Sequence, residues 1–265
     1  MTNDKTEGDT LMKPNVPEQI EEVEQKIQHS TKLARALELD GSPVAVAIVP
    51  ELPEGLAHLQ YRATVCMMIQ IARRGDNFCS SGDGILCGGR ANLGVGESPI
   101  RKLDEFLVHK EKLFRSKIEA RKLLDLAKKR APNQGNYLAF SPLEKAGFTP
   151  DVVLFVGTPA QISRIVFLDA FETGDFDMVH GEPLCSGAIA IPITTGKIGI
   201  SFMDMACRLF GRYRPEEMVI GIPYQRLLRI VDSVDLSSAG TASPSILLKL
   251  AGGFLRRRVP ANSSI

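Results

Sequence analysis

The sequence predicts a single α/β domain with a mixed or mostly parallel sheet flanked by helices. Two continuous apolar runs, Val44–Val49 and residues 152–156, support this prediction, because strands covered on both faces are apolar throughout rather than alternating. Helix-like segments separate the strand-like runs, and this alternation is typical of α/β folds. The 265 residues are 44% hydrophobic and 24% charged, which excludes a disordered, collagen-like or coiled-coil chain.

The sequence divides the chain into three segments. Residues 1–17 are polar and lack an apolar core, so they predict a disordered leader rather than a secretory signal. No linker rich in Pro, Ser or Gly splits residues 18–258, and we expect one α/β domain there. Residues 259–265 are expected to be a frayed tail. Within the domain, a helical insertion at about residues 98–132 is expected to pack over the functional site.

In the first half of the domain, the sequence predicts two helices with one strand between them. Residues 18–39 place apolar side chains at roughly helical spacing, and the strand Val44–Val49 follows. Residues 64–74 have helix-forming residue types, and Gly75 is placed to end that helix. Residues 76–96 hold six glycines in 21 positions, which predicts a loop with room for one short strand.

The second half predicts two helices over residues 101–130 and then a strand–turn–helix unit. Thr158 and Pro159 suit the start of a helix that follows strand 152–156, and Gly174 suits its end. Further expected elements are a strand at 197–202, a strand at 218–222, a helix after each of them, and an amphipathic helix from residue 244 to about 255. The acid pair Glu216–Glu217 is interpreted as surface charge.

Charge and hydropathy exclude several partners. The 32 basic and 31 acidic residues leave a net charge of +1, which gives no electrostatic reason to expect nucleic acid or an anionic membrane. No apolar stretch is long enough to span a bilayer. We therefore expect a cytoplasmic protein, whose thiols stay reduced. A charge this small is compatible with a homo-oligomer.

Four of the five cysteines stand beside a glycine or near a helix start. Cys66 lies near the start of a predicted helix, and Cys87 directly precedes Gly88 and Gly89. Cys185 enters a run of small residues, and Cys207 follows a predicted strand. Four thiols placed in this way suit an iron–sulfur cluster, and we expect them to converge on one site.

Other interpretations of the cysteines stay open. No CxxC pair occurs, so the zinc-ribbon signature is missing. Free cysteine is also a common apolar core residue. Cys79 has no adjacent glycine, and we expect it to lie outside the site.

Two glycine-containing turns are candidate anion sites. Residues 87–96 match neither the Walker loop nor the dinucleotide fingerprint. Gly88, Gly89 and Arg90 remain candidates for an anion nest, with a plain glycine turn as the alternative. Thr158 and Gln161 mark a helix N-terminus at the end of a buried strand, where free amides can bind anions. We expect this turn to open into the same cleft as Cys87; the alternative is an ordinary helix cap.

Six short motifs are spread through residues 30–235. They are Ala72-Arg-Arg-Gly75, Cys87-Gly-Gly-Arg90, Val156-Gly-Thr-Pro-Ala-Gln161, Cys185-Ser-Gly-Ala188, Glu216-Glu-Met218 and Gly221-Ile-Pro223. By these motifs the chain resembles the family catalogued as domain of unknown function 169, which is widespread in archaea and anaerobic bacteria. The resemblance implies that the cysteines matched by Cys66, Cys87, Cys185 and Cys207 recur in the family, but it implies no activity. At the last of these the chain reads Cys-Arg-Leu where family members have a Cys-Arg-Gly type of turn.

Three function classes follow from these residues. The first is an iron–sulfur or other metal-binding protein that acts with a redox partner in electron transfer or cofactor assembly. The second is an enzyme whose reactive thiol, Cys66, acts on a small anionic substrate held by Arg90 and the Thr158 turn. The third is a non-catalytic protein that binds a small ligand, with all its cysteines as core residues.

Overall fold

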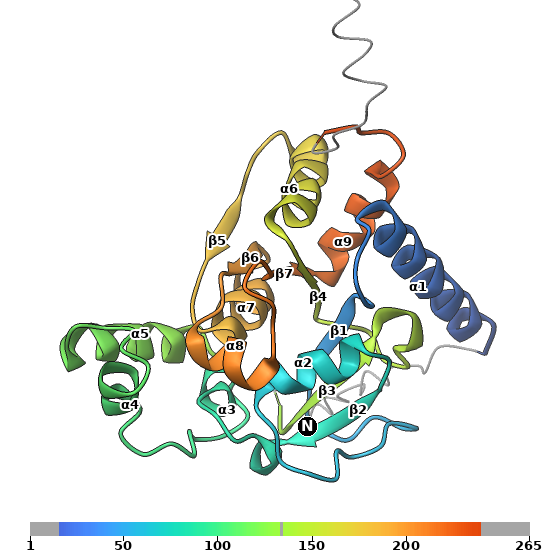
Figure 1. Ribbon diagram of the computed structural model, residues 1–265. Coiled ribbons are helices and arrows are strands. Elements are labelled where there is room, and N and C mark those ends of the chain that lie inside the picture. The colour runs from blue at the N-terminus through green and yellow to red at the C-terminus, as the bar shows by residue number, and fades with distance from the viewer. Residues whose placement is uncertain (1–15, 133–134, 240–265) are drawn as a thin grey trace, which may run out of the picture.

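The structure is a computed structural model that describes residues 16–132 and 135–239. Within these ranges the strands form one sheet in the order β2-β3-β1-β4-β7-β6-β5 (Figure 1). The pair β5–β6 is parallel and the other neighbouring pairs in these ranges are antiparallel. The strands are β1 (Val44–Val49), β2 (Phe78–Ser81), β3 (Tyr137–Pro142), β4 (Val152–Gly157), β5 (Met178–His180), β6 (Ile198–Ser201) and β7 (Met218–Pro223).

The α/β class with a mixed sheet is confirmed, whereas the alternative of a mostly parallel sheet is wrong. Both β1 and β4 are interior strands, as their continuous apolar sequences predicted. Their side chains alternate between two cores: Val46 and Leu154 face one, and Ala45 and Phe155 face the other. Helices on both faces make a strand apolar whichever way its neighbours run, so the apolar pattern did not report strand direction.

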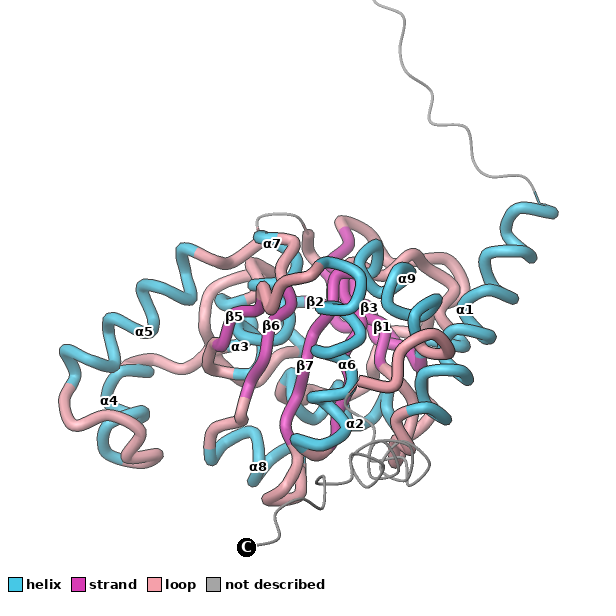
Figure 2. Tube along the Cα trace, turned by 90° about the horizontal axis from the view of Figure 1, so that it is seen from above, coloured by secondary structure: helices cyan, strands magenta, loops and turns pink. Residues whose placement is uncertain are grey.

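Helices cover both faces of the sheet (Figure 2). One core lies under α1 (Val16–Ala36), α6 (Pro159–Thr173) and α9 (Tyr224–Ser233). The opposite core lies under α2 (Val65–Arg73), the short π-helix η3 (Cys185–Ala190) and α8 (Met205–Gly211). The helix α7 (Ile191–Thr195) continues from η3. The second of these cores contains the candidate site.

The expected signals at the ends of α6 are confirmed. At α2, Thr64, expected as the first helical residue, instead caps the helix by accepting the Met67 amide. Thr158 and Gln161 form a reciprocal capping box at the start of α6, which satisfies two amides that the helix leaves unpaired. Gly174 ends α6 with φ +71°, a left-handed conformation that costs glycine little.

The glycine-rich segment contains more regular structure than the one short strand expected there, and the insertion contains its two expected helices. Beside β2, residues 76–96 include the 3-10 turn η1 (Gly82–Gly84) and the one-turn helix α3 (Gly89–Asn92). The two predicted insertion helices are confirmed as α4 (Leu103–His109) and α5 (Lys117–Lys129). They project to one side of the sheet in both views (Figures 1 and 2).

Some expectations need correction or fall outside the described residues. The strand β3 and the 3-10 turn η2 (Leu143–Lys145) were not predicted. Cys185 and Cys207 lie in η3 and α8 rather than in loops, because small residues and an Asp204 cap allow helical turns there. Residues 1–15 of the expected leader, the helix at 244–255 and the tail at 259–265 lie outside the described residues, whereas residues 16 and 17 of the expected leader begin α1. Among those that are described, no helix combines the length and apolarity needed to cross a membrane.

Candidate functional site

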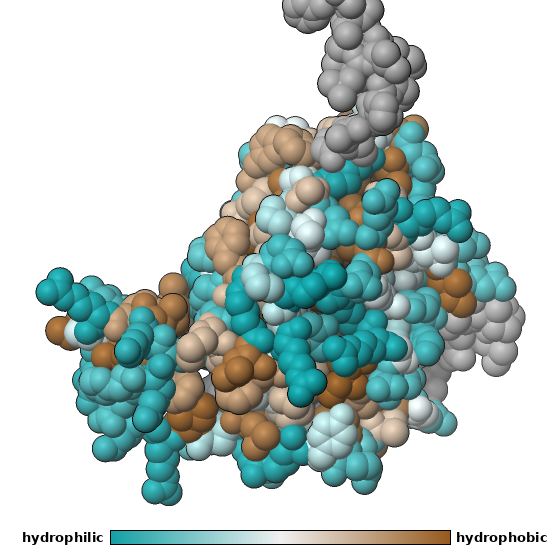
Figure 3. Space-filling view, viewed as in Figure 1, coloured by the Kyte–Doolittle hydropathy of each residue, from teal (hydrophilic) through white to brown (hydrophobic). Residues whose placement is uncertain are grey.

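A cavity of about 310 Å³ lies between the α4–α5 insertion and the helices of the second core. Apolar side chains gather on the surface where the insertion meets the body (Figure 3). The cavity brings together all four cysteines that were predicted to converge. These residues, called the cavity cysteines below, are Cys66 of α2, Cys87 before α3, Cys185 of η3 and Cys207 of α8.

Two cavity cysteines sit in the first turns of helices. Cys66 follows the N-cap Thr64, whose Oγ1 lies 3.0 Å from the Cys66 Sγ. Cys207 donates its backbone amide to Oδ1 of the N-cap Asp204 at 2.7 Å. Helix starts favour negative charge, but at Cys207 the hydrogen bond to Cys66, burial and nearby Asp204 oppose the thiolate.

The other two cavity cysteines receive hydrogen bonds at sulfur. The backbone amides of Val65 and Gly89 donate to Cys87, and Asn92 Nδ2 lies 3.4 Å from the Cys185 Sγ. A Cβ at Gly89 would lie 2.6 Å from Val65 Cγ2 and 3.2 Å from the Cys87 Sγ. Glycine at this position therefore allows the backbone to approach the sulfur closely.

The cavity cysteines differ in their tendency to ionise. The Cys207 thiol donates a hydrogen bond to Cys66, and together with Thr64 it lowers the Cys66 pKa although burial opposes this. The same hydrogen bond, and then burial, raise the pKa of Cys207. Burial is also the main reason that the pKa values of Cys87 and Cys185 are raised. Cys66 is therefore the cavity cysteine that ionises most readily.

The charged groups that line the cavity are carboxylates. Glu111 lies between α4 and α5, and burial together with nearby Asp204 raises its pKa to about 7. No Lys, Arg or His is among the lining residues described. In residues 16–132 and 135–239, no group of three or more His, Cys, Asp or Glu is placed so that it could hold a metal ion.

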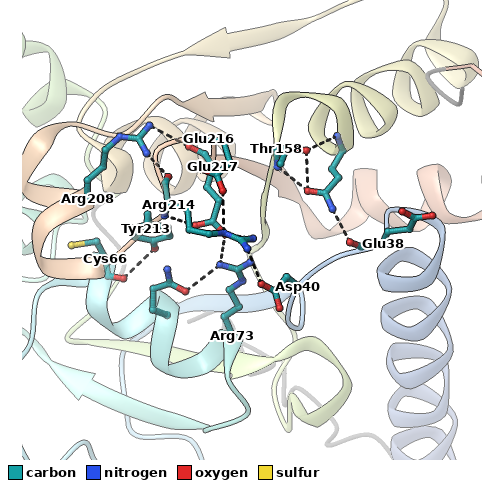
Figure 4. A network of polar contacts seen from close by, with 12 residues as sticks. Glu38, Asp40, Cys66, Arg73, Thr158, Arg208, Tyr213, Arg214, Glu216 and Glu217 are labelled. Carbon is teal, nitrogen blue, oxygen red and sulfur yellow. Dashed lines mark hydrogen bonds and ion pairs between the residues drawn. The ribbon is translucent and has the colours of Figure 1, made fainter.

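Of the predicted anion-binding residues, Gly88 and Gly89 line the cavity and three others do not. Arg90 forms a 2.9 Å ion pair with Asp83. Gln161 donates to the Glu38 carbonyl at 2.7 Å, and Thr158 is held within the capping box (Figure 4). The expectation that the Thr158 turn opens into the cleft of Cys87 is therefore wrong, because α6, which this turn caps, packs in the first core on the opposite face of the sheet from the cysteines.

A buried ion pair joins α2 to the segment before β7. Arg73 of α2 and Glu217 before β7 are 2.9 Å apart, and their side chains are 8% and 1% exposed. Glu217 Oε2 also accepts the Arg214 backbone amide at 2.8 Å. The loop that carries these groups also places Tyr213 against α2 (Figure 4). Glu217 is thus a core residue, and its interpretation as surface charge is wrong because Arg73 compensates its burial.

Sequence reasoning placed the insertion over the site but missed the acidic side chains of the cavity wall. Asp204, three residues before Cys207, had a readable N-cap signal, whereas Glu111 stands in a charged segment without a distinguishing motif. Cys79 lies elsewhere: it packs with Ala47, Leu56 and Ala139. Burial raises its pKa to about 11.

Comparisons with known proteins identify relatives without a described activity. The family model described as DUF169, uncharacterised ArCR, matches residues 32–233, a range that contains every cavity cysteine. An uncharacterized protein of the archaeon Methanocaldococcus jannaschii is 27% identical over 219 residues, which cover 78% of this chain and 93% of that protein. No solved structure matches the chain.

Proposed function

Since the chain belongs to the DUF169 family, which is described as uncharacterised, we propose its function from the geometry of its own site. The cavity cysteines hold an iron–sulfur cluster. The observation that carries this proposal is that four cysteines from segments far apart in the sequence line one cavity. Cysteine thiolates are the usual ligands of such clusters, commonly four of them. A bound cluster would supply one-electron chemistry, for electron transfer or cofactor assembly.

The spacing of the thiols differs between a single ion and a cluster. A tetrahedral zinc site brings its sulfurs within roughly 4 Å of one another, because each Zn–S bond is about 2.3 Å. A cluster of four irons separates its thiolate ligands by roughly 6–7 Å. The Cys66 and Cys207 thiols are hydrogen-bonded to each other, so cluster binding requires this pair to move apart within the cavity.

The surroundings of the sulfurs support the proposal further. Hydrogen bonds to cluster ligands tune the reduction potential, and here Val65, Gly89 and Asn92 donate to cavity cysteines. Ligation requires each thiol to lose its proton. Cys66 would ionise first, since its pKa is already lowered.

Anaerobic purification followed by reconstitution with iron and sulfide tests the proposal. We expect a brown protein with about four irons per chain. Cys87→Ser should lose the colour and most of the iron, and it should be less stable because ligation energy contributes to folding.

The matched control is Cys79→Ala, which removes a buried thiol outside the cavity. This variant should keep its iron, because Cys79 packs outside the cavity in a small cluster with Ala47, Leu56 and Ala139. Wild-type protein that stays free of iron after reconstitution would contradict the cluster proposal.

A reactive thiol is the second candidate function, and the lowered pKa of Cys66 favours it. Thiolates are the nucleophilic form of cysteine, and helix starts stabilise them. Alkylation of the iron-free protein with iodoacetamide, followed by peptide mass spectrometry, distinguishes the two. If Cys66 reacts far faster than the other cavity cysteines in a wild-type protein that never binds iron, the reactive-thiol function is supported instead.

A further inference from the structure

The α4–α5 insertion contributes an apolar wall to the cavity. A volume of about 310 Å³ is at the lower end of the range for pockets that bind small molecules, roughly 300–1,000 Å³. Such pockets are mostly apolar with a few polar groups that orient the ligand. The apolar residues that the insertion supplies include Leu103, Phe106, Leu107, Leu123 and Leu124.

One carboxylate oxygen in this wall is buried without a partner. Glu111 lines the cavity, and its Oε2 makes no hydrogen bond within the described part of the chain. The Ala206 backbone amide donates to the carboxyl group of Glu111, so the side chain is held in place. A buried acceptor without a donor is costly, and a donor supplied by a ligand would remove that cost.

The charges that line the cavity favour a cationic ligand over an anionic one. Glu111 and Asp204 are acidic, and no basic side chain is among the described lining residues. Arg90, the cation expected to hold an anion, instead pairs with Asp83. An anionic ligand would meet carboxylates and no cation here, whereas a cationic donor would meet an acceptor.

We infer that the cavity binds a small organic amine whose apolar body packs against the insertion leucines and whose ammonium group donates to Glu111 Oε2. This inference goes beyond the proposed function: it assigns a ligand class to the same cavity and does not depend on the cluster. The apolar wall holds the body of the molecule, and the carboxylate sets its orientation beside the cavity cysteines.

Calorimetric titration of the anaerobically purified protein with 1-octylamine and octanoate at about pH 8 tests this inference, since the amine is then charged. The two molecules have the same apolar length and opposite charge. We expect octylamine to bind at least about tenfold more tightly, because a charge-assisted hydrogen bond contributes that much. Butylamine should bind much more weakly than octylamine, because it buries less apolar area.

The variant Glu111→Gln replaces an acceptor by a donor and removes the charge. We expect its octylamine affinity to fall about tenfold or more and its preference for the amine over octanoate to disappear. Glu119→Gln on α5 is the control, since Glu119 is exposed and outside the cavity; it should bind as wild type does. Circular dichroism verifies that both variants are folded.

Measuring iron in the same samples separates the two proposals. Octylamine binding that depends on Glu111, in protein that stays free of iron after reconstitution, would support the amine inference while contradicting the cluster. An iron-loaded protein that binds octanoate as tightly as octylamine, or a Glu111→Gln variant with unchanged affinity, would overturn the amine inference alone.

Discussion

Tyr213 donates its hydroxyl hydrogen to the backbone carbonyl of Cys66, with 3.1 Å between the two oxygens. The tyrosine is buried and follows α8, whereas Cys66 lies in the first turn of α2. This contact therefore joins the segment after Cys207 to the helix that carries Cys66. Tyr213 does not itself line the cavity, but it links the elements that carry two of the cavity cysteines.

Replacing Tyr213 by Phe should lower the free energy of unfolding by about 1 kcal/mol, the usual net contribution of such a hydrogen bond. Urea denaturation measures the change. If the contact also positions the cysteines, the variant should hold less iron after reconstitution. Tyr61→Phe, at an exposed position, should match wild type in both measurements.

Replacing Glu217 by Gln should lower the free energy of unfolding by about 3 kcal/mol, because it leaves Arg73 buried without its full counter-charge. Its neighbour Glu216 is exposed and makes a 3.5 Å surface ion pair. The Glu216→Gln control should cost less than about 1 kcal/mol. Equal costs for the two variants in urea denaturation would contradict the buried role of Glu217.

The same ion pair predicts acid sensitivity. Burial raises the Glu217 pKa, but the Arg214 amide and Arg73 outweigh burial and lower it below its ordinary value of 4.5. The folded protein then binds fewer protons than the unfolded chain, so this stabilisation is present above about pH 4.5 and is lost as pH falls through the folded pKa. Urea midpoints of wild type should therefore fall more steeply with acid than those of Glu217→Gln.

Glu111 predicts the opposite pH dependence. Its pKa is raised from 4.5 to about 7, so the folded state binds more protons than the unfolded chain. The contribution of this group is fully present below about pH 4.5 and is lost as pH rises toward 7. Urea midpoints of wild type should fall across this window relative to those of Glu111→Gln; parallel curves would contradict the burial of this carboxyl.

Replacing Gly89 by Ala should destabilise the protein by about 1–3 kcal/mol, the usual cost of overpacking. The added Cβ would meet Val65 at 2.6 Å and the sulfur of Cys87 at 3.2 Å. Gly147→Ala is the control, because a Cβ there meets nothing within 4 Å. Thermal denaturation should show a loss for the first variant and little change for the second.

Local sequence patterns determined much of the fold. The apolar runs of β1 and β4, the Thr64 and Thr158 caps and the Gly174 stop depend on residues within a few positions of one another. Such neighbours interact in any context, so their pattern can be read without the rest of the molecule. The cysteines beside helix starts and glycines were recognisable for the same reason.

Only the tertiary structure decided which segments meet. Strand direction, the position of Thr158 away from the cysteines and the burial of Glu217 depend on packing between residues far apart in the sequence. The common cavity of the cysteines likewise requires α2, η3 and α8 to lie on the same face of the sheet. A charged segment such as the one around Glu111 has the same sequence pattern whether it faces water or a cavity, because its surroundings come from α8 and not from its neighbours in the chain.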